Sequence, residues 1–143
     1  MDSHVISTFG NAFGALLTVA LVGLIPEPWR QRSMAAMVGL ASIAYLGNSA
    51  FLWPVEFGLA ALMLSLAGWG AFWYPAIGVA WVVHGIIDLV HHEAGSPMFA
   101  TVPLSSYGCA VYDPLMAMWF FAGAPSSSKL WSGLIRGRKS ARA

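Results

Sequence analysis

The feature that most constrains this chain is a long stretch almost without charge. From Ser33 to Ile87 the only Asp, Glu, Lys or Arg is Glu56. One crossing of a lipid bilayer needs about 20 apolar residues, so the stretch has room for several crossings. Hydrophobic residues make up 58% of the chain and charged residues 9%, whereas an ordinary soluble domain carries about 25% charged residues. We therefore expect an integral membrane protein with little structure outside the bilayer.

Prolines and polar residues divide the apolar sequence into segments. Pro26, Pro28, Pro54 and Pro75 stand between apolar runs, at positions where proline ends a helix. Because lipid offers no partners to backbone groups, each crossing should be an α-helix. We predict an all-α fold, a polytopic membrane helix bundle of about five transmembrane helices. The predicted spans are residues 5–25, 34–53, 55–74, 76–93 and 105–123.

The distribution of Lys and Arg predicts how the bundle is oriented. Arg30 and Arg32 follow the first span, and a basic tail follows the last one. An odd number of spans puts both segments on one side of the membrane, as the positive-inside rule requires. We predict that the N-terminus is outside and the C-terminus is cytoplasmic. Residues 1–125 would form a single transmembrane domain and residues 126–143 a basic juxtamembrane tail. The basic residues of the tail are Lys129, Arg136, Arg138, Lys139 and Arg142.

The two ends of the chain indicate location and partners. No Lys or Arg precedes the first apolar run, so the basic region of a secretory signal peptide is missing and the first span should be retained. The tail segment KLWSGLIRGRK predicts a short interfacial helix on anionic membrane lipid. We expect no nucleic-acid binding, because no folded domain would present a groove-binding element. The default location is the bacterial inner (plasma) membrane, and a eukaryotic organelle membrane fits the same pattern.

Gly10 and Gly14 permit close helix approach, and thus a homo-oligomer, without predicting one.

The fourth predicted span, AWVVHGIIDLVHHEAG, carries the residues that point to chemistry. On a helix, His84, Asp88 and His91 fall within an arc of about 60°, and His92 widens it to about 100°. One ionisable side chain at the bilayer centre costs about 2.5–3.5 kcal/mol on insertion scales. We therefore expect this polar face to point into the bundle, toward partners, water or a bound ion.

Other predicted spans offer partners for this face. Asp113, Glu56, Asn48, Ser49 and Asn11 all fall in the outer halves of their spans when the topology above is applied. Their shared depth predicts one polar chamber that opens to the extracytoplasmic side. If the membrane is a bacterial inner membrane, that side is the periplasm.

Two of the partner acids have more than one interpretation. Asp113 precedes Pro114, which removes a backbone hydrogen bond and loosens the helix. The resulting kink is either tolerated by packing or aims the Asp113 carboxylate at the fourth span. Glu56 either caps the N-terminus of the third span, where a negative charge is favourable, or joins the polar site.

Imidazole and carboxylate groups four residues apart on a helix can bind one metal ion together. The predicted metal ligands are His84, Asp88, His91 and His92. Asp113 is a fourth ligand or a base acting on bound water, and Asp113 and Glu56 are the predicted catalytic residues. Zinc suits such a nitrogen and oxygen set best, and iron or manganese remains open.

A site without metal is the main alternative. Here the imidazoles and carboxylates satisfy one another in a hydrogen-bonded polar core. Cys109 is the only cysteine in the chain, which excludes an intrachain disulfide and a metal site with several cysteines. We expect no role for His4, which precedes the first span.

The segments WVVHGIIDLVHH and SSYGCAVYDPLMAMWF resemble the signature region of an uncharacterised family of small integral membrane proteins, domain of unknown function 6010. The resemblance implies a polytopic membrane fold and no particular activity. A weaker likeness is to intramembrane hydrolases of the alkaline ceramidase and adiponectin-receptor type, which hold zinc with three histidines from several helices. This chain has fewer spans and gathers its histidines on one helix, so that likeness is an analogy. The residues that match the uncharacterised family are His84, Asp88, His91, His92 and Asp113.

An enzyme is the first of three functional hypotheses. It would be a metal-dependent hydrolase whose lipid or other apolar small-molecule substrate enters sideways from the bilayer. His84, Asp88 and His91 or His92 would hold the ion, and Asp113 or Glu56 would handle the proton. In a metal-free version the same groups isomerise or cyclise an apolar substrate by acid and base catalysis.

The other two hypotheses are not enzymatic. A proton-relay or transport component would line an aqueous path with titrating groups. The sequence disfavours it, because the inner halves of the spans offer little beyond Ser42 and Ser65, although an oligomer would supply a path between chains. A membrane-complex assembly subunit would instead use the polar face to meet another membrane protein.

Overall fold

The computed structural model describes residues 2–47, 54–97, 99 and 101–140. These residues form six α-helices and no β-strand, so the predicted all-α fold is confirmed for the part of the chain that is described. The helices are α1 (Ser3–Val22), α2 (Trp29–Gly47), α3 (Val55–Gly70), α4 (Tyr74–Glu93), α5 (Ser105–Phe121) and α6 (Ser127–Ser140).

The ends of α4 follow from local sequence. Pro75 lies in its first turn, where the missing N–H costs nothing and the fixed φ suits a helix. At the other end Gly95 has a φ of +67°, a left-handed conformation that glycine adopts without strain. Gly95 N–H donates to the His92 carbonyl at 3.0 Å, and Ser96 N–H donates to the His91 carbonyl at 2.9 Å. This Schellman motif ends α4 and brings Ser96 back beside His91.

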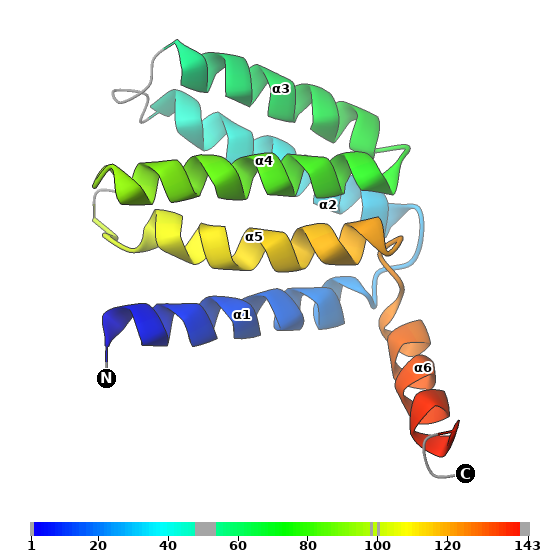
Figure 1. The fold of residues 1–143 in the computed structure, drawn as a ribbon. Helices are drawn as coiled ribbons and strands as arrows, with labels where there is room; N and C mark the ends of the chain where they lie inside the picture. The colour runs from blue at the N-terminus through cyan, green and yellow to red at the C-terminus, as the bar shows by residue number, and fades with distance from the viewer. Residues whose placement is uncertain (1, 48–53, 98, 100, 141–143) are drawn as a thin grey trace.

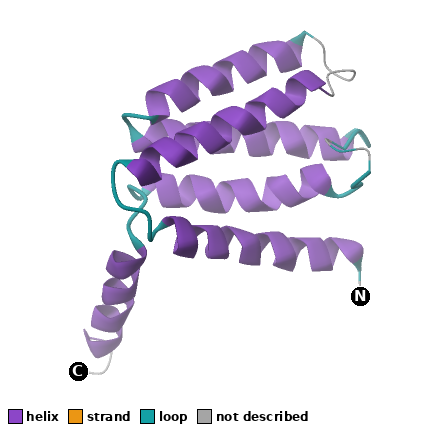
Figure 2. Cartoon of the chain, turned by 180° about the vertical axis from the view of Figure 1, so that it is seen from behind, coloured by secondary structure: helices purple, strands orange, loops and turns teal. Residues whose placement is uncertain are grey.

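Helix α4 lies at the centre of the bundle. It packs against α2, α3 and α5, while α1 packs against the outer side of α5 (Figure 1). Figure 2 shows the same arrangement from behind. The apolar core runs between these helices, and its largest fully buried apolar side chains are Tyr45, Phe120, Met34, Met63, Ile77 and Met116.

The helix connections lie at the two ends of the bundle. The turns α1–α2, α3–α4 and α5–α6 are at one end, and the N-terminus is at the other (Figure 1). Ser127, the first residue of α6, ties that helix to α1, since its N–H donates to the Gly23 carbonyl at 3.1 Å and its hydroxyl to the Ala20 carbonyl at 2.6 Å. From this junction α6 turns away from the bundle. The Arg30 loop and the basic tail thus begin at the same end of the molecule.

The five predicted spans match five of the helices. Helices α1, α3, α4 and α5 lie within or close to their predicted ranges, and α2 begins at Trp29, earlier than the predicted residue 34. The helix predicted in the tail is present as α6. The structure contains no bilayer, so the number of spans and their orientation stay predictions. Asn48 and Ser49 lie outside the described residues.

Much of the outer surface is apolar. Two helices, α1 and α4, are long and apolar enough to cross a membrane by length and composition, and α3 is a shorter apolar helix. A soluble monomer rarely shows large contiguous apolar patches. Large apolar side chains of α1 that are exposed include Ile6, Phe9, Phe13, Leu16, Leu17 and Leu21.

Candidate functional site

The site is centred on a contact between α4 and α5. His84 Nδ1 lies 2.7 Å from Asp113 Oδ2, and the two residues are 6% and 0% exposed. When Asp113 is ionised its oxygens only accept, so Nδ1 carries the proton and the lone pair of a neutral His84 is on Nε2. Gly85 lets the helices meet here, because a Cβ at that position would lie 3.1 Å from Asp113 Cβ.

Asp88 lies one turn after His84 on the same buried face of α4. Its Oδ2 is 3.4 Å from His84 Nδ1, so His84 faces two carboxylates at once. Its Oδ1 accepts a hydrogen bond from the Tyr45 hydroxyl at 3.1 Å. Tyr45 comes from α2, and its ring centroid is 5.3 Å from that of His84. Three helices therefore build the centre.

The centre has more acceptors than donors. Asp88 Oδ2 and Asp113 Oδ1 are buried without a hydrogen-bond partner among the described residues. A buried acceptor left without a partner costs about 1–3 kcal/mol, and more when it is charged. Two carboxylates beside one imidazole therefore favour a cation or an additional proton at this place.

Cys109 extends the centre on α5. It is half-buried and stands four residues before Asp113, so both side chains project from one face of that helix. One ligand atom each from His84, Asp88 and Cys109 lie within 4.8 Å of one another. These three residues are the group of metal-ligating side chains that the described part of the chain brings together.

A second buried pair lies beside this centre. His91 Nε2 is 2.9 Å from Glu56 Oε1 on α3, and His91 Nδ1 is 3.0 Å from the Ser96 carbonyl oxygen. A carbonyl only accepts, so Nδ1 donates to it. The Tyr45 ring stacks on His91 with the centroids 6.0 Å apart, so Tyr45 contacts both this pair and His84.

His92 and Asn11 point elsewhere. The His92 ring is half-buried and contacts the rings of His4 and Tyr107, with centroids 5.5 Å and 5.1 Å away. The Asn11 amide donates to the Ser7 carbonyl within α1 at 2.8 Å. Neither side chain joins the centre around His84.

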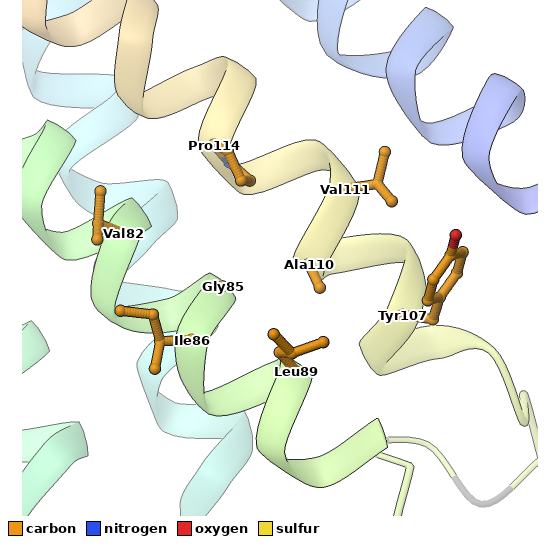
Figure 3. Close-up of a pocket in the computed structure, with 8 residues that line it drawn as sticks. All are labelled: Val82, Gly85, Ile86, Leu89, Tyr107, Ala110, Val111 and Pro114. Carbon is orange, nitrogen blue, oxygen red and sulfur yellow. The ribbon is translucent and has the colours of Figure 1, made fainter. Parts of the chain in front are cut away.

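An apolar groove runs along the outer side of α4 and α5 next to the centre (Figure 3). Its volume is about 320 Å³, which is within the range of small-molecule sites. Gly85 forms part of its wall, and Asp113 Oδ2 would lie 3.5 Å from a Cβ at Gly85. The groove is lined by Val82, Gly85, Ile86, Leu89, Tyr107, Ala110, Val111 and Pro114.

A family model, described as a family of unknown function (DUF6010), matches residues 6–126 of the chain. The chain belongs to the DUF6010 family. The match covers both buried pairs, Tyr45 and Cys109, so the whole candidate site lies within the family region. No curated protein and no solved structure matches the chain. The family membership inferred from the sequence is confirmed, and it brings no activity with it.

In this DUF6010 protein the predicted site residues divide into three groups. His84, Asp88 and Asp113 come together. The Asp113 carboxylate points at α4, as expected if the kink at Pro114 directs it there. Glu56 points into the bundle and pairs with His91, and the N-cap of α3 is Pro54 without a side-chain bond. His92 and Asn11 lie apart from both groups.

Sequence reasoning missed Tyr45 and Cys109. Tyr45 is a phenol within the apolar second span, and a buried phenol usually needs a hydrogen-bond partner. Cys109 lies at the i−4 position from Asp113, which places both on one helix face. The sequence therefore held a signal for each residue: the polar hydroxyl of Tyr45 in an apolar span, and the spacing of Cys109 from Asp113. Which helix contacts Tyr45 could be learned only from the three-dimensional fold.

Proposed function

We propose that this DUF6010 protein is a multi-pass integral membrane protein in which α1 to α5 are the spans, the N-terminus is outside and the C-terminus is cytoplasmic. Three observations support this: the high mean hydropathy of +0.69, the exposed apolar face of α1, and the basic segments at one end of the bundle. Reporter fusions at each helix connection test it. Active periplasmic reporters at the α2–α3 and α4–α5 connections, with inactive ones at the other three, are expected. A reversed pattern would overturn the orientation.

Within that frame, the protein acts as a metal-dependent hydrolase on a lipid or another apolar small molecule. The observation that carries this proposal is a buried His84, Asp88 and Asp113 centre that packs against Gly85, a residue lining an apolar groove. A lipid-facing groove lets an apolar substrate reach a polar centre without crossing water. Ionisable groups inside a membrane usually mark a functional site.

The residues of the centre fit a bound ion. Asp88 Oδ2 is a buried oxygen without a hydrogen-bond partner among the described residues, and one ligand atom of Asp88 lies within 4.8 Å of one of His84. His84 and Asp88 would hold the ion, and a zinc ion there would supply a water of pKa about 7 and polarise a substrate carbonyl. Asp113 fixes the orientation of the His84 ring, as carboxylates commonly do for metal-binding histidines.

The second oxygen of Asp113 suits proton transfer. Oδ1 has no hydrogen-bond partner among the residues described, while Oδ2 is held by His84. During hydrolysis of an ester or amide, Oδ1 would take the proton of the attacking water and pass it to the leaving alcohol or amine. Glu56, the other predicted catalytic acid, is occupied by His91, so Asp113 is the better placed of the two.

A metal-free acid and base enzyme is the second candidate. The His84–Asp113 contact at 2.7 Å is complete as a general base with its orienting carboxylate. Such a pair can move a proton between two carbons of an apolar substrate, which is isomerase or cyclase chemistry. This candidate uses the same groove and requires no ion.

Metal content separates the two candidates. Detergent-purified wild type, His84→Ala and Asp88→Ala are compared by elemental mass spectrometry after zinc supplementation, and His92→Ala is the matched control because its ring lies outside the centre. We expect about one zinc per chain in wild type and His92→Ala, and loss in the other two. Folded wild type without stoichiometric metal would overturn the metal-dependent proposal in favour of the metal-free one. Screening lipid extracts for hydrolysis products then tests the reaction.

A further inference from the structure

Cys109 has a half-buried thiol beside the centre, and the proposed hydrolase has so far no role for it. Its sulfur belongs to the group in which single ligand atoms of His84, Asp88 and Cys109 lie within 4.8 Å of one another. The three residues come from facing sides of α4 and α5, the helix pair that packs most extensively. A rigid pair of helices therefore presents a nitrogen, an oxygen and a sulfur to one point.

The spacing of the three atoms is close to that of a metal site. Zinc bonds of about 2.0–2.3 Å at tetrahedral angles place ligand atoms about 3.3–3.7 Å from one another. Side-chain adjustments of about 1 Å, within rotamer freedom, would close the observed spacing to these values.

The atoms of Asp88 indicate that a ligand is missing from the group. Asp88 is fully buried, and the Tyr45 hydroxyl holds its Oδ1. Its Oδ2 has no hydrogen-bond partner among the described residues. A buried carboxylate oxygen without a hydrogen bond carries a penalty that a cation would remove.

We propose that Cys109 supplies a thiolate that completes, with His84 and Asp88, a three-residue zinc site with an open fourth position. The inference rests on the proposed metal-dependent function and names the ion and its third ligand. Three protein ligands and one open position are the pattern of catalytic zinc sites. A thiolate selects zinc over magnesium and manganese, which prefer oxygen ligands. Ion binding displaces the thiol proton, which leaves to solvent or to a neighbouring carboxylate.

The other histidines of α4 are already engaged. His91 contacts Glu56 and the Ser96 carbonyl, and His92 contacts His4 and Tyr107. Recruiting either one would break these contacts, whereas recruiting Cys109 requires none of them to break. The third ligand is therefore more readily a sulfur from α5 than a second nitrogen from α4.

Cobalt(II) is the probe for this proposal, because it occupies zinc sites and its electronic spectrum reports its ligands. Cobalt bound by a thiolate gives an intense charge-transfer band in the near ultraviolet, and cobalt in any tetrahedral site gives weaker bands in the visible. Cys109 is the only cysteine of the chain, so a thiolate band has a single source. Detergent-purified wild type is titrated with Co²⁺ and then with Zn²⁺, and Cys109→Ser is compared with it.

The proposal expects one Co²⁺ per chain, a near-ultraviolet band in wild type that zinc abolishes, and no such band in Cys109→Ser. The variant should bind zinc at least about tenfold more weakly. Stoichiometric Co²⁺ with visible bands and no charge-transfer band in wild type would overturn the role of Cys109 while leaving the metal-dependent function standing. Absence of bound Co²⁺ and Zn²⁺ in folded wild type would overturn both. The wild-type spectrum decides the matter even if Cys109→Ser fails to fold.

Discussion

Asp113 Oδ2 lies 2.7 Å from His84 Nδ1, and the residue that permits this contact is the glycine next to His84. A Cβ at Gly85 would be 3.1 Å from Asp113 Cβ, a contact tighter than side chains normally make. The β-carbon of Asp113 is attached directly to the backbone and cannot swing away. The distance between α4 and α5 at the level of the site is thus set by the absence of one methyl group.

The substitution Gly85→Ala should therefore destabilise the protein and loosen the site. Alanine gains about 0.5–1 kcal/mol of helix propensity over glycine, but overpacking against Asp113 costs about 1–3 kcal/mol. We expect a net loss of about 1 kcal/mol in the free energy of unfolding. Thermal unfolding in detergent, followed by circular dichroism, measures the change.

Gly58→Ala is the matched control for this substitution. Gly58 is on α3, and nothing lies within 4 Å of a Cβ built there. The same change should raise the melting temperature at this position, since only the propensity gain remains. If Gly85→Ala also raised it, the close approach of α4 and α5 at the site would be wrong.

The extent to which the sequence anticipates the structure differs between helix α4 and its partners. The spacing of His84, Asp88 and His91 follows from helix geometry alone, and all three are buried as predicted. That Asp113 meets His84 while Glu56 meets His91 depends on the order of helices around α4. Residues on different helices have no fixed spacing in sequence, so composition and periodicity predict a buried polar face on α4 but not the division of its contacts into two pairs.

Asp113→Asn should weaken metal binding without abolishing it. The amide oxygen can still accept from His84 Nδ1, but the negative charge that makes the imidazole a better ligand is lost. Removal of such a supporting carboxylate typically costs 10–100-fold in metal affinity. Competition titration with a chromophoric zinc chelator measures this, and Asp88→Asn should lose more because Asp88 is a proposed ligand. Equal zinc affinity for wild type and Asp113→Asn would contradict the positioning role.

The His91–Glu56 pair should contribute to stability and not to metal binding. Breaking a buried ionic pair by removing one partner costs about 3–5 kcal/mol, whereas apolar replacement of both is often close to neutral. In a double-mutant cycle with His91→Phe and Glu56→Met, we expect the double variant to be more stable than the sum of the single losses predicts, by about 1–3 kcal/mol. Chemical denaturation in detergent provides the free energies.

Zinc content of the same variants tests the second half of that prediction. Both single variants, once folded, should retain about one zinc per chain, because neither His91 nor Glu56 is a proposed ligand. Loss of zinc in folded His91→Phe would show that His91 is a ligand, as the sequence pattern predicted. Additive energies in the cycle would instead show that the two side chains do not act as a pair.

Filling the groove between α4 and α5 should block the substrate and spare the ion. Ala110 lines the groove on the α5 side (Figure 3), and Ala110→Leu adds three carbons to the space in front of Asp113 while leaving every proposed ligand in place. Misplacing a substrate by about 1 Å can cost 10²-fold in rate, so we expect hydrolysis of the lipid substrate to fall at least about tenfold with zinc content unchanged. Leu62→Phe is the control, since Leu62 lines a separate apolar groove between α3 and α4. If both variants lost activity equally, or if Ala110→Leu kept full activity, the substrate would not enter between α4 and α5.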